Sequence, residues 1–481
     1  MNVDFLIGGE AVCAEGNRRF ERIDPVTGKV ATTSAAASVA DALRAVKAAQ
    51  EAFPSWAKIS PGERRGLLNA AADILEKKSA EFIDLMITET GATRPWAGFN
   101  VALAAGMARE AAAMTTRICG ETIPANKPGT LAMSVPRPKG VCLGIAPWNA
   151  PVILGVRAIA MPIACGNTAV LKSSEACPGV HRLIGQCFKE AGFPDGVLNV
   201  ISNAPEDAAE LVKALIEAPE VRHVNFTGSS AVGRIIGRLA GENLKPALLE
   251  LGGKAPLIVL DDADLDAAVN AAIFGAFMNQ GQICMSTERI IVDRKIADTF
   301  VGKLAARAAG LPCGDPREQV VLGSLISDDA ARKMDALLAD AISKGAKVVA
   351  GGTREGIIHS ATLLDNVRPD MRVYREESFG PVKSIIRVDG VEEAIRVAND
   401  TEYGLSSAVF TRDLDCALEV ADRLDTGICH INGPTVSDEP QMPFGGVKDS
   451  GYGRFGGKAA IAEFTDLRWI TIEAPDQHYP F

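Results

Sequence analysis

The chain has 481 residues, of which 47% are hydrophobic and 23% charged, and its formal net charge is −10. This length exceeds one ordinary hydrophobic core, so we expect at least two globular domains and little disorder. The acidic balance, without a long basic cluster, gives no electrostatic reason to expect binding to nucleic acid or to an anionic membrane.

The N-terminal segment MNVDFLIGGEAV has no basic leader and only a short apolar run, so we expect no secretory signal and a cytoplasmic protein. Residues 140–171 are apolar, but prolines, asparagines and an arginine interrupt them, which indicates strand, loop, helix and strand instead of a membrane span. Ten cysteines without CxxC spacing and five scattered histidines predict reduced thiols and no metal site.

Helical patterns come first along the chain, over residues 39–57 and 60–91. The second pattern begins with Ser60, Pro61 and Glu63 at the N-cap, N1 and N3 positions, which predicts a capping box. Residues 120–140 contain four prolines and end the helical region. This segment fits either a linker or an extended hairpin.

Strand candidates alternate with helices from about residue 141 onward. The first series is VCLGIAP, TAVLKSS, VLNVIS, HVNFTG and ALLELGG, and the second runs from PLIVLDD through RIIVD, AKVVAGG, VKSIIRVD, LSSAVFT and GICHING. Such alternation is typical of parallel α/β sheets. We therefore predict two successive α/β domains.

Three polar residues stand at places where chemistry is common. Cys284 lies in NQGQICMSTERIIV, between a glycine-containing turn and an apolar strand; Glu250 ends another strand; Asn149 follows a third, between two prolines. A thiol nucleophile, a carboxylate with a pKa raised by burial and an amide donor for an oxyanion would suit these positions. Taken alone, each also fits a structural role: a buried thiol, a solvent-facing strand end and an ordinary turn.

A dinucleotide signal is present but unusual, because no GxGxxG follows the first strand. The nearest substitute is FTGSSAVGRIIG, where Gly228, Ser229 and Gly233 separate a strand from a helix whose N-terminus suits a pyrophosphate. Glycines there serve packing equally well. Lys172 and Glu175 close another strand, and the carboxylate would bind ribose hydroxyls and repel a 2′-phosphate, which favours NAD over NADP.

The segments PWN, LKSSE, FTGSSAVG, LELGGK, GQIC, EESFGPV and PFGGVKDSGYGR follow one another along the chain. Together they resemble the NAD(P)-dependent aldehyde dehydrogenase superfamily over essentially the whole length. APWNAPVILGVRAIAMPIACGNT and CHINGPTVSDEPQMPFGG are most similar to bacterial vanillin, benzaldehyde and salicylaldehyde dehydrogenases.

The resemblance implies an α/β fold with a Rossmann-type cofactor domain (1–119 and 140–251) and an α/β catalytic domain (252–448). It also implies a small β oligomerisation arm (120–139 and 466–481) in a homodimer or homotetramer. Cys284 would be the nucleophile, Glu250 the general base, and Asn149, with the Cys284 backbone N–H, the oxyanion hole. The implied cofactor contacts are Ile145, Trp148, Lys172, Glu175, Gly228, Ser229, Gly233, Leu251, Glu377 and Phe379.

The implied reaction is NAD-dependent oxidation of an aromatic aldehyde to its acid through a cysteine thiohemiacetal and a thioester. Because Glu250 is present, we expect hydrolysis of the thioester and not transfer to coenzyme A. Ala150 leaves room for a ring that Trp96 and Phe444 would wall, although both aromatics also fit core packing. Arg157, in an apolar helix, would meet a ring hydroxyl, the product carboxylate or a neighbouring acid.

Two alternatives stay open at this stage. An aliphatic aldehyde or a semialdehyde would be oxidised by the same superfamily chemistry. A cysteine hydrolase or acyltransferase would use Cys284 without a redox step and would form no NADH.

Overall fold

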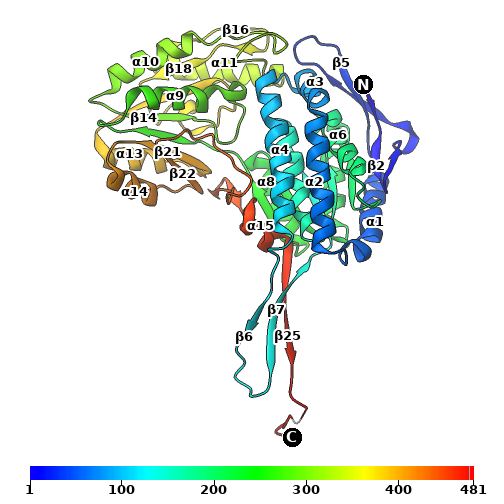
Figure 1. Ribbon diagram of the computed structural model, residues 1–481. Helices are drawn as coiled ribbons and strands as arrows, with labels where there is room; N and C mark the ends of the chain where they lie inside the picture. Colours follow the sequence, from blue (N-terminus) through cyan, green and yellow to red (C-terminus); the bar gives the residue numbers. More distant parts are fainter. Residues whose placement is uncertain (476) are drawn as a thin grey trace.

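The computed structural model describes residues 1–475 and 477–481, so residue 476 of the predicted arm segment lies outside the described residues. Two α/β bodies lie side by side, and a narrow three-stranded arm projects from one of them (Figure 1). The predicted mixed α/β fold with parallel sheets is confirmed. The domain boundaries stay predictions.

The first body is built on an eight-stranded sheet whose centre is parallel. The parallel strands are β8 (Val141–Ile145), β9 (Thr168–Lys172), β10 (Leu198–Ile201), β11 (Val221–Thr227) and β12 (Ala247–Glu250). Short antiparallel strands close its edges: β2 (Phe5–Ile7), β3 (Glu10–Val12) and β24 (Gly451–Tyr452). Each central strand matches one of the predicted apolar runs.

The second body holds a seven-stranded sheet with one antiparallel edge, formed by β15 (Lys347–Ala350). Its parallel strands are β13 (Pro256–Val259), β14 (Arg289–Asp293), β18 (Thr362–Asp365), β19 (Val382–Val388), β21 (Ser406–Phe410) and β22 (Ile428–Ile431). Parallel strands buried on both faces read as near-continuous apolar runs, which is why the sequence predicts β13, β14, β19, β21 and β22. The sequence analysis does not predict β18, which has only four residues.

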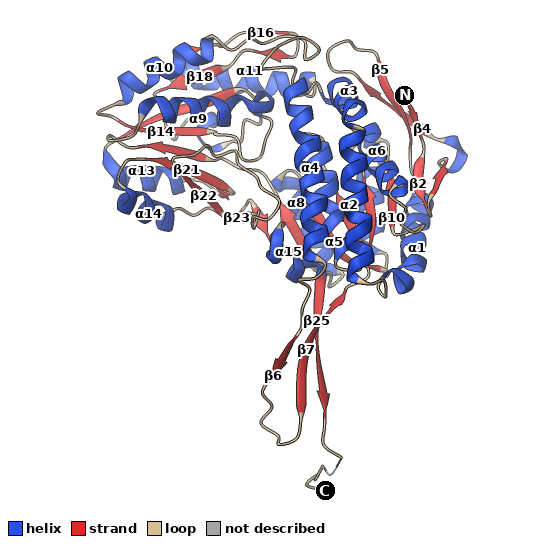
Figure 2. Cartoon of the chain, viewed as in Figure 1, coloured by secondary structure: helices blue, strands red, loops and turns tan. Residues whose placement is uncertain are grey.

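Helices α2 (Pro61–Lys77), α4 (Arg94–Met114) and α5 (Pro151–Ala164) pack together over the first sheet (Figure 2). The capping box at the start of α2 is confirmed, since Ser60 Oγ accepts from Glu63 N (3.2 Å) and Glu63 Oε2 accepts from Ser60 N (3.1 Å). All of α5 is buried against protein, which explains its apolar sequence. In the part of the chain that the structure describes, no helix has the length and apolarity to cross a bilayer.

The proline-rich segment 120–140 forms a hairpin and not a linker. Its strands β6 (Glu121–Ile123) and β7 (Leu131–Pro138) pair antiparallel, and β25 (Thr465–Ile472) adds on the other side of β7. Pro124 and Pro128 lie in the connection between β6 and β7. Pro136 and Pro138 lie in the part of β7 that extends past β6 and pairs with β25 alone, where one side of the strand has no partner strand among the described residues and proline is tolerated. The three strands extend well clear of the body (Figures 1 and 2).

Candidate active site

Cys284 follows a tight turn that the backbone adopts at some cost. After α9 (Leu265–Phe277), the residues Asn279, Gln280 and Gly281 have φ values of 49°, 56° and 72°. Gln280 Nε2 donates to Ser324 O (3.0 Å), which holds the turn from the second body. Left-handed backbone at non-glycine residues persists only where surrounding contacts enforce it. The position of the thiol is therefore fixed by its neighbours.

Asn149 is tied directly to this turn. It follows β8, and its Nδ2 donates to Gln282 O (3.0 Å). Its own carbonyl accepts from Trp96 Nε1 (3.0 Å) and from Asn279 Nδ2 (3.0 Å). The Asn149 side-chain amide is thus held at the carbonyl of Gln282, two residues before Cys284. From there it can donate to an oxygen atom beside the sulfur.

Glu250 ends β12 and is 1% exposed. Neither carboxylate oxygen has a hydrogen-bond partner among the described residues. Burial raises the pKa of Glu250 to about 8, although Arg157 and the Cys284 thiol partly oppose this rise. A carboxylate in this state can take up a proton near neutral pH.

Cys284 also lies in surroundings that disfavour negative charge. Burial raises the pKa of its thiol well above the ordinary value, and Glu250 and Glu377 raise it further, while Arg157 lowers it. The pKa of Glu377 itself is raised to about 7, chiefly by burial. A cationic group bound near these three residues would stabilise their ionised forms.

Three cavities surround these groups. The polar cavity is lined by Cys284 and Glu250, and the apolar cavity is lined by Cys284 and Asn149. The cleft opens along α8 (Ser230–Glu242). Asn149 also lines the polar cavity. The sulfur therefore lies where the polar and apolar cavities meet.

Most of the predicted cofactor residues line the polar cavity or the cleft. The polar cavity contains Trp148, Gly228, Ser229, Leu251, Glu377 and Phe379, and the cleft contains Ile145, Trp148, Lys172, Glu175 and Gly228. Gly233 is missing from the described residues that line them and lies against Leu251, where a Cβ would come within 2.4 Å of that side chain. Because Gly233 has no side chain, α8 can pack closely against Leu251, so this glycine has a packing role.

Two aromatic rings and one acid lie together in the wall of the polar cavity. Trp148 and Phe379 meet edge to face at 5.8 Å, and Glu377 Oε1 accepts from Gly253 N (2.9 Å). In the cleft, Glu175 pairs with Lys172 and accepts from Asn203 Nδ2 (2.9 Å). Both acids thus have a defined orientation.

The four predicted substrate residues, Trp96, Ala150, Arg157 and Phe444, all line the apolar cavity. Arg157 forms an ion pair with Asp438, and its guanidinium lies 4.2 Å from the centre of the Phe444 ring. Of the three partners considered for Arg157, the neighbouring acid is therefore the one that it contacts in the structure. Phe444 also packs in the adjoining core.

Several lining residues of the apolar cavity escaped the sequence analysis. Ile153 and Leu154 follow Ala150 at helical spacing on α5, a signal that a helical projection would have revealed. The others come from distant segments without a local pattern: Phe99, Leu103, Phe274, Met278, Ile283, Met285, Val436, Ser437 and Asp438. No cluster of metal-ligating side chains occurs among the described residues, and all ten cysteines are free thiols.

The sequence profile of the aldehyde dehydrogenase family matches residues 12–470. The chain is 62% identical to the vanillin dehydrogenase of Pseudomonas sp. strain HR199, covering 100% of this chain and 99% of the relative. It is 40% identical to the benzaldehyde dehydrogenase [NAD(+)] of Pseudomonas putida, covering 95% and 94%. The crystal structure of a salicylaldehyde dehydrogenase from Pseudomonas putida G7 complexed with salicylaldehyde superposes with a TM-score of 0.99, at 51% identity and full coverage of both chains.

The contact between Gly253 and the thiol segment yields a first prediction. A Cβ at Gly253 would lie 2.2 Å from Cys284 O, so Gly253→Ala must displace the Cys284 backbone. We expect slower alkylation of Cys284 by iodoacetamide, measured by peptide mass spectrometry, and a loss of about 1–3 kcal/mol in the free energy of unfolding.

Gly241→Ala is the matched control, because a Cβ there meets nothing within 4 Å. Alkylation of Cys284 should be unaffected in this variant. Equal alkylation rates in the two variants would contradict the prediction.

Proposed function

Because the chain belongs to the aldehyde dehydrogenase family, we propose that it oxidises aromatic aldehydes to carboxylic acids with NAD as the hydride acceptor. The observation that carries this proposal is the position of Cys284, which lines a polar and an apolar cavity at once. A nucleophile at such a junction can hold an aldehyde from one side and present its hydrogen to the other. The names of the vanillin, benzaldehyde and salicylaldehyde dehydrogenases that it resembles support an aromatic substrate.

The aldehyde would lie in the apolar cavity with its ring away from Cys284. Ala150 leaves space beside Asn149, while Trp96 and Phe444 offer aromatic surface to the ring. Arg157 lies in the same wall, fixed by Asp438. Its role is to shape the cavity and to place one charged group near a ring substituent.

Cys284 is the proposed nucleophile. After the thiol proton passes to solvent, the thiolate sulfur forms a bond to the carbonyl carbon, and the carbonyl oxygen becomes an alkoxide as the C=O π bond breaks. Asn149 Nδ2 and the Cys284 backbone N–H are the proposed donors to that oxygen. Donors that bind the alkoxide better than the flat carbonyl lower the barrier, and the loss of one costs about 3 to 4 kcal/mol.

Glu250 is the proposed general base for the second half of the reaction. After the hydride leaves, Cys284 carries a thioester, and Glu250 removes a proton from the attacking water. The C–S bond then breaks, which releases the carboxylic acid and restores the thiol. The pKa of about 8 makes Glu250 basic enough to take this proton.

The polar cavity and the cleft suit a dinucleotide. Cys284, Glu250 and Glu377, which line the polar cavity, all have raised pKa values, so this cavity favours a ligand group that brings positive charge. Bound NAD supplies the hydride acceptor. We propose that Glu377 and Phe379 hold its nicotinamide end and Ser229 its pyrophosphate.

The remaining proposed contacts lie in the cleft, where Trp148, Ile145, Lys172 and Gly228 would hold the adenosine half. Glu175 would accept from the ribose hydroxyls and repel a 2′-phosphate, which supports NAD over NADP. Leu251 would pack below the nicotinamide end.

The arm is the proposed site of assembly into a homodimer or homotetramer. Leu467 and Trp469 are 73% and 77% exposed, and they lie two residues apart on one face of β25. An exposed apolar strand face of this kind is a common pairing surface between subunits.

The proposed location is the cytoplasm. Ten free thiols support a reducing compartment.

A substrate panel tests the proposed activity. We expect NADH absorbance to rise when the protein meets NAD and benzaldehyde, vanillin or salicylaldehyde, and to rise more slowly with short aliphatic aldehydes, which fill less of the apolar cavity. Faster turnover of the aliphatic set would contradict the aromatic assignment. Release of acid without NADH would point to a hydrolase.

Glu250→Gln tests the base. We expect one burst of NADH per active site and a steady rate lower by roughly 100-fold or more, because hydride transfer survives and thioester hydrolysis does not. The wild-type steady rate should rise with pH through about 8, as Glu250 loses its proton, and the variant should lack this rise. Stopped-flow absorbance measures both quantities, and a variant without a burst would argue against this role.

A double substitution, Leu467→Lys with Trp469→Lys, tests the arm. Like charges facing each other across the subunit contact should separate the subunits, so light scattering should give a mass near the 50.6 kDa of one chain. Leu43→Lys, at an exposed apolar residue of α1 (Val39–Trp56), is the control that should keep the wild-type mass. A double variant with unchanged mass would place the interface elsewhere.

A further inference from the structure

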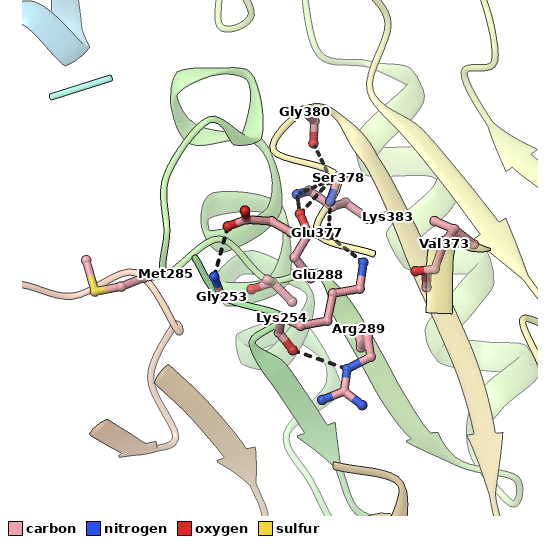
Figure 3. A network of polar contacts seen from close by, with 12 residues as sticks. Gly253, Lys254, Met285, Glu288, Arg289, Val373, Glu377, Ser378, Gly380 and Lys383 are labelled. Atoms are coloured by element: carbon pink, nitrogen blue, oxygen red, sulfur yellow. Dashed lines mark hydrogen bonds and ion pairs between the residues drawn. The ribbon is translucent and has the colours of Figure 1, made fainter. Parts of the chain in front are cut away.

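Lys254, Glu288 and Lys383 form a buried ionic cluster next to Glu377 and Ser378 (Figure 3). The side chains of both lysines are 0% exposed and that of Glu288 is 2% exposed. Lys254 Nζ lies 2.6 Å from Glu288 Oε2, and Lys383 Nζ lies 2.5 Å from Glu288 Oε1. These contacts hold the pKa of Glu288 far below its usual range, so the carboxylate is ionised.

The cluster forms hydrogen bonds with the residues on both sides of Glu377. Lys254 Nζ donates to Glu376 O (2.6 Å), while Ser378 N and Ser378 Oγ donate to the two oxygens of Glu288 (2.9 and 2.5 Å). Glu288 therefore accepts from four donors, two on the lysines and two on Ser378. Glu377 lies between Glu376 and Ser378 and lines the polar cavity.

Residues 376–380 need contacts with other segments to keep their conformation. Residues 376–380 form an irregular connection between α12 (Arg372–Arg375) and β19, and Phe379 within it has a φ of 50°. A phenylalanine in the left-handed region is strained and holds that conformation only if neighbouring groups enforce it. Figure 3 shows Ser378 and Gly380 turned toward the cluster.

Three functional segments meet at Glu288. It follows Cys284 by four residues, Lys254 follows Glu250 by four, and Lys383 follows Glu377 by six. Their backbones are also in close approach: a Cβ at Gly281 would lie 2.4 Å from Gly380 O. One carboxylate thus links the segments of the nucleophile, the base and the nicotinamide-side acid.

Stability alone does not account for this cluster. It carries one net positive charge in the interior, and apolar side chains of similar volume would pack there without the cost of removing three charges from water. Hydrogen bonds between ions depend on direction, whereas apolar packing does not. The hydrogen bonds to Glu376 and Ser378 therefore orient the backbone of these residues.

We propose that Glu288, with Lys254 and Lys383, is a positioning residue that fixes Glu377 and Phe379 relative to Cys284 and so sets the affinity for the nicotinamide end of NAD. This inference rests on the proposed function, in which Glu377 and Phe379 contact that end of the cofactor. Glu288 touches neither substrate nor cofactor and acts only through the 376–380 backbone.

Glu288→Gln and Lys383→Met test the proposal. Glutamine keeps the shape but offers one acceptor oxygen in place of two, and methionine leaves the Lys254–Glu288 pair in place. For each variant we expect Kd for NAD, measured by titration calorimetry, to rise about ten-fold, the loss of a charge-assisted hydrogen bond. KM for NAD should rise more than KM for the aldehyde.

Asp365→Asn is the matched control. Asp365 is a buried acid of the same sheet, paired with Arg387 (2.8 Å), and its change removes an equivalent charge away from residues 376–380. Alkylation of Cys284 without NAD and the melting temperature report any general damage in all three variants. A rise in Kd confined to the two cluster variants supports positioning.

Two other results would overturn the proposal. If Kd for NAD stays at the wild-type value in Lys383→Met or Glu288→Gln while the melting temperature falls, the cluster is only structural. If Asp365→Asn raises Kd equally, the effect is not specific to the loop. Failure of the wild-type protein to bind NAD would instead overturn the proposed function itself, which separates the two claims.

Discussion

One sulfur atom has to face two cavities, and the rest of the site is arranged around that constraint. The left-handed turn at residues 279–281 fixes the sulfur, and Asn149 locks this turn to the first sheet through Gln282 O. The second sheet contributes the opposite wall, through Glu377 and Phe379. Asn149 and Glu250 lie at the carboxyl ends of β8 and β12 in the first sheet. Cys284 and Glu377 instead precede the amino ends of β14 and β19, so opposite edges of the two sheets meet at this reactive atom.

Glu250 and Glu288 are both buried, but their surroundings shift their pKa values in opposite directions. Glu250 has no hydrogen-bond partner among the described residues, and its pKa is raised, so its proton is exchangeable near neutral pH. Glu288, with four donors, stays ionised and is fixed in place. The same residue type thus serves as a movable proton site in one place and as a rigid support in the other, and the difference comes entirely from its neighbours.

Much of the architecture was predictable because parallel strands buried on both faces leave apolar runs that stand out in the sequence. The capping box at Ser60 was equally local and is confirmed. The site residues that the aldehyde dehydrogenase resemblance implies line the three cavities, except Gly233, which packs against Leu251, and their roles stay predictions. What the sequence could not reveal depends on contacts between distant segments: Asp438 beside Arg157, and the cluster around Glu288.

If hydride is released from an adduct on Cys284, a Cys284→Ser protein must form NADH far more slowly than the wild type. Serine keeps the size and the backbone of the turn but is a far weaker nucleophile without a base that activates it. We expect the rate of NADH formation with an aromatic aldehyde to fall by roughly three orders of magnitude or more. NADH formation at the wild-type rate would contradict this expectation.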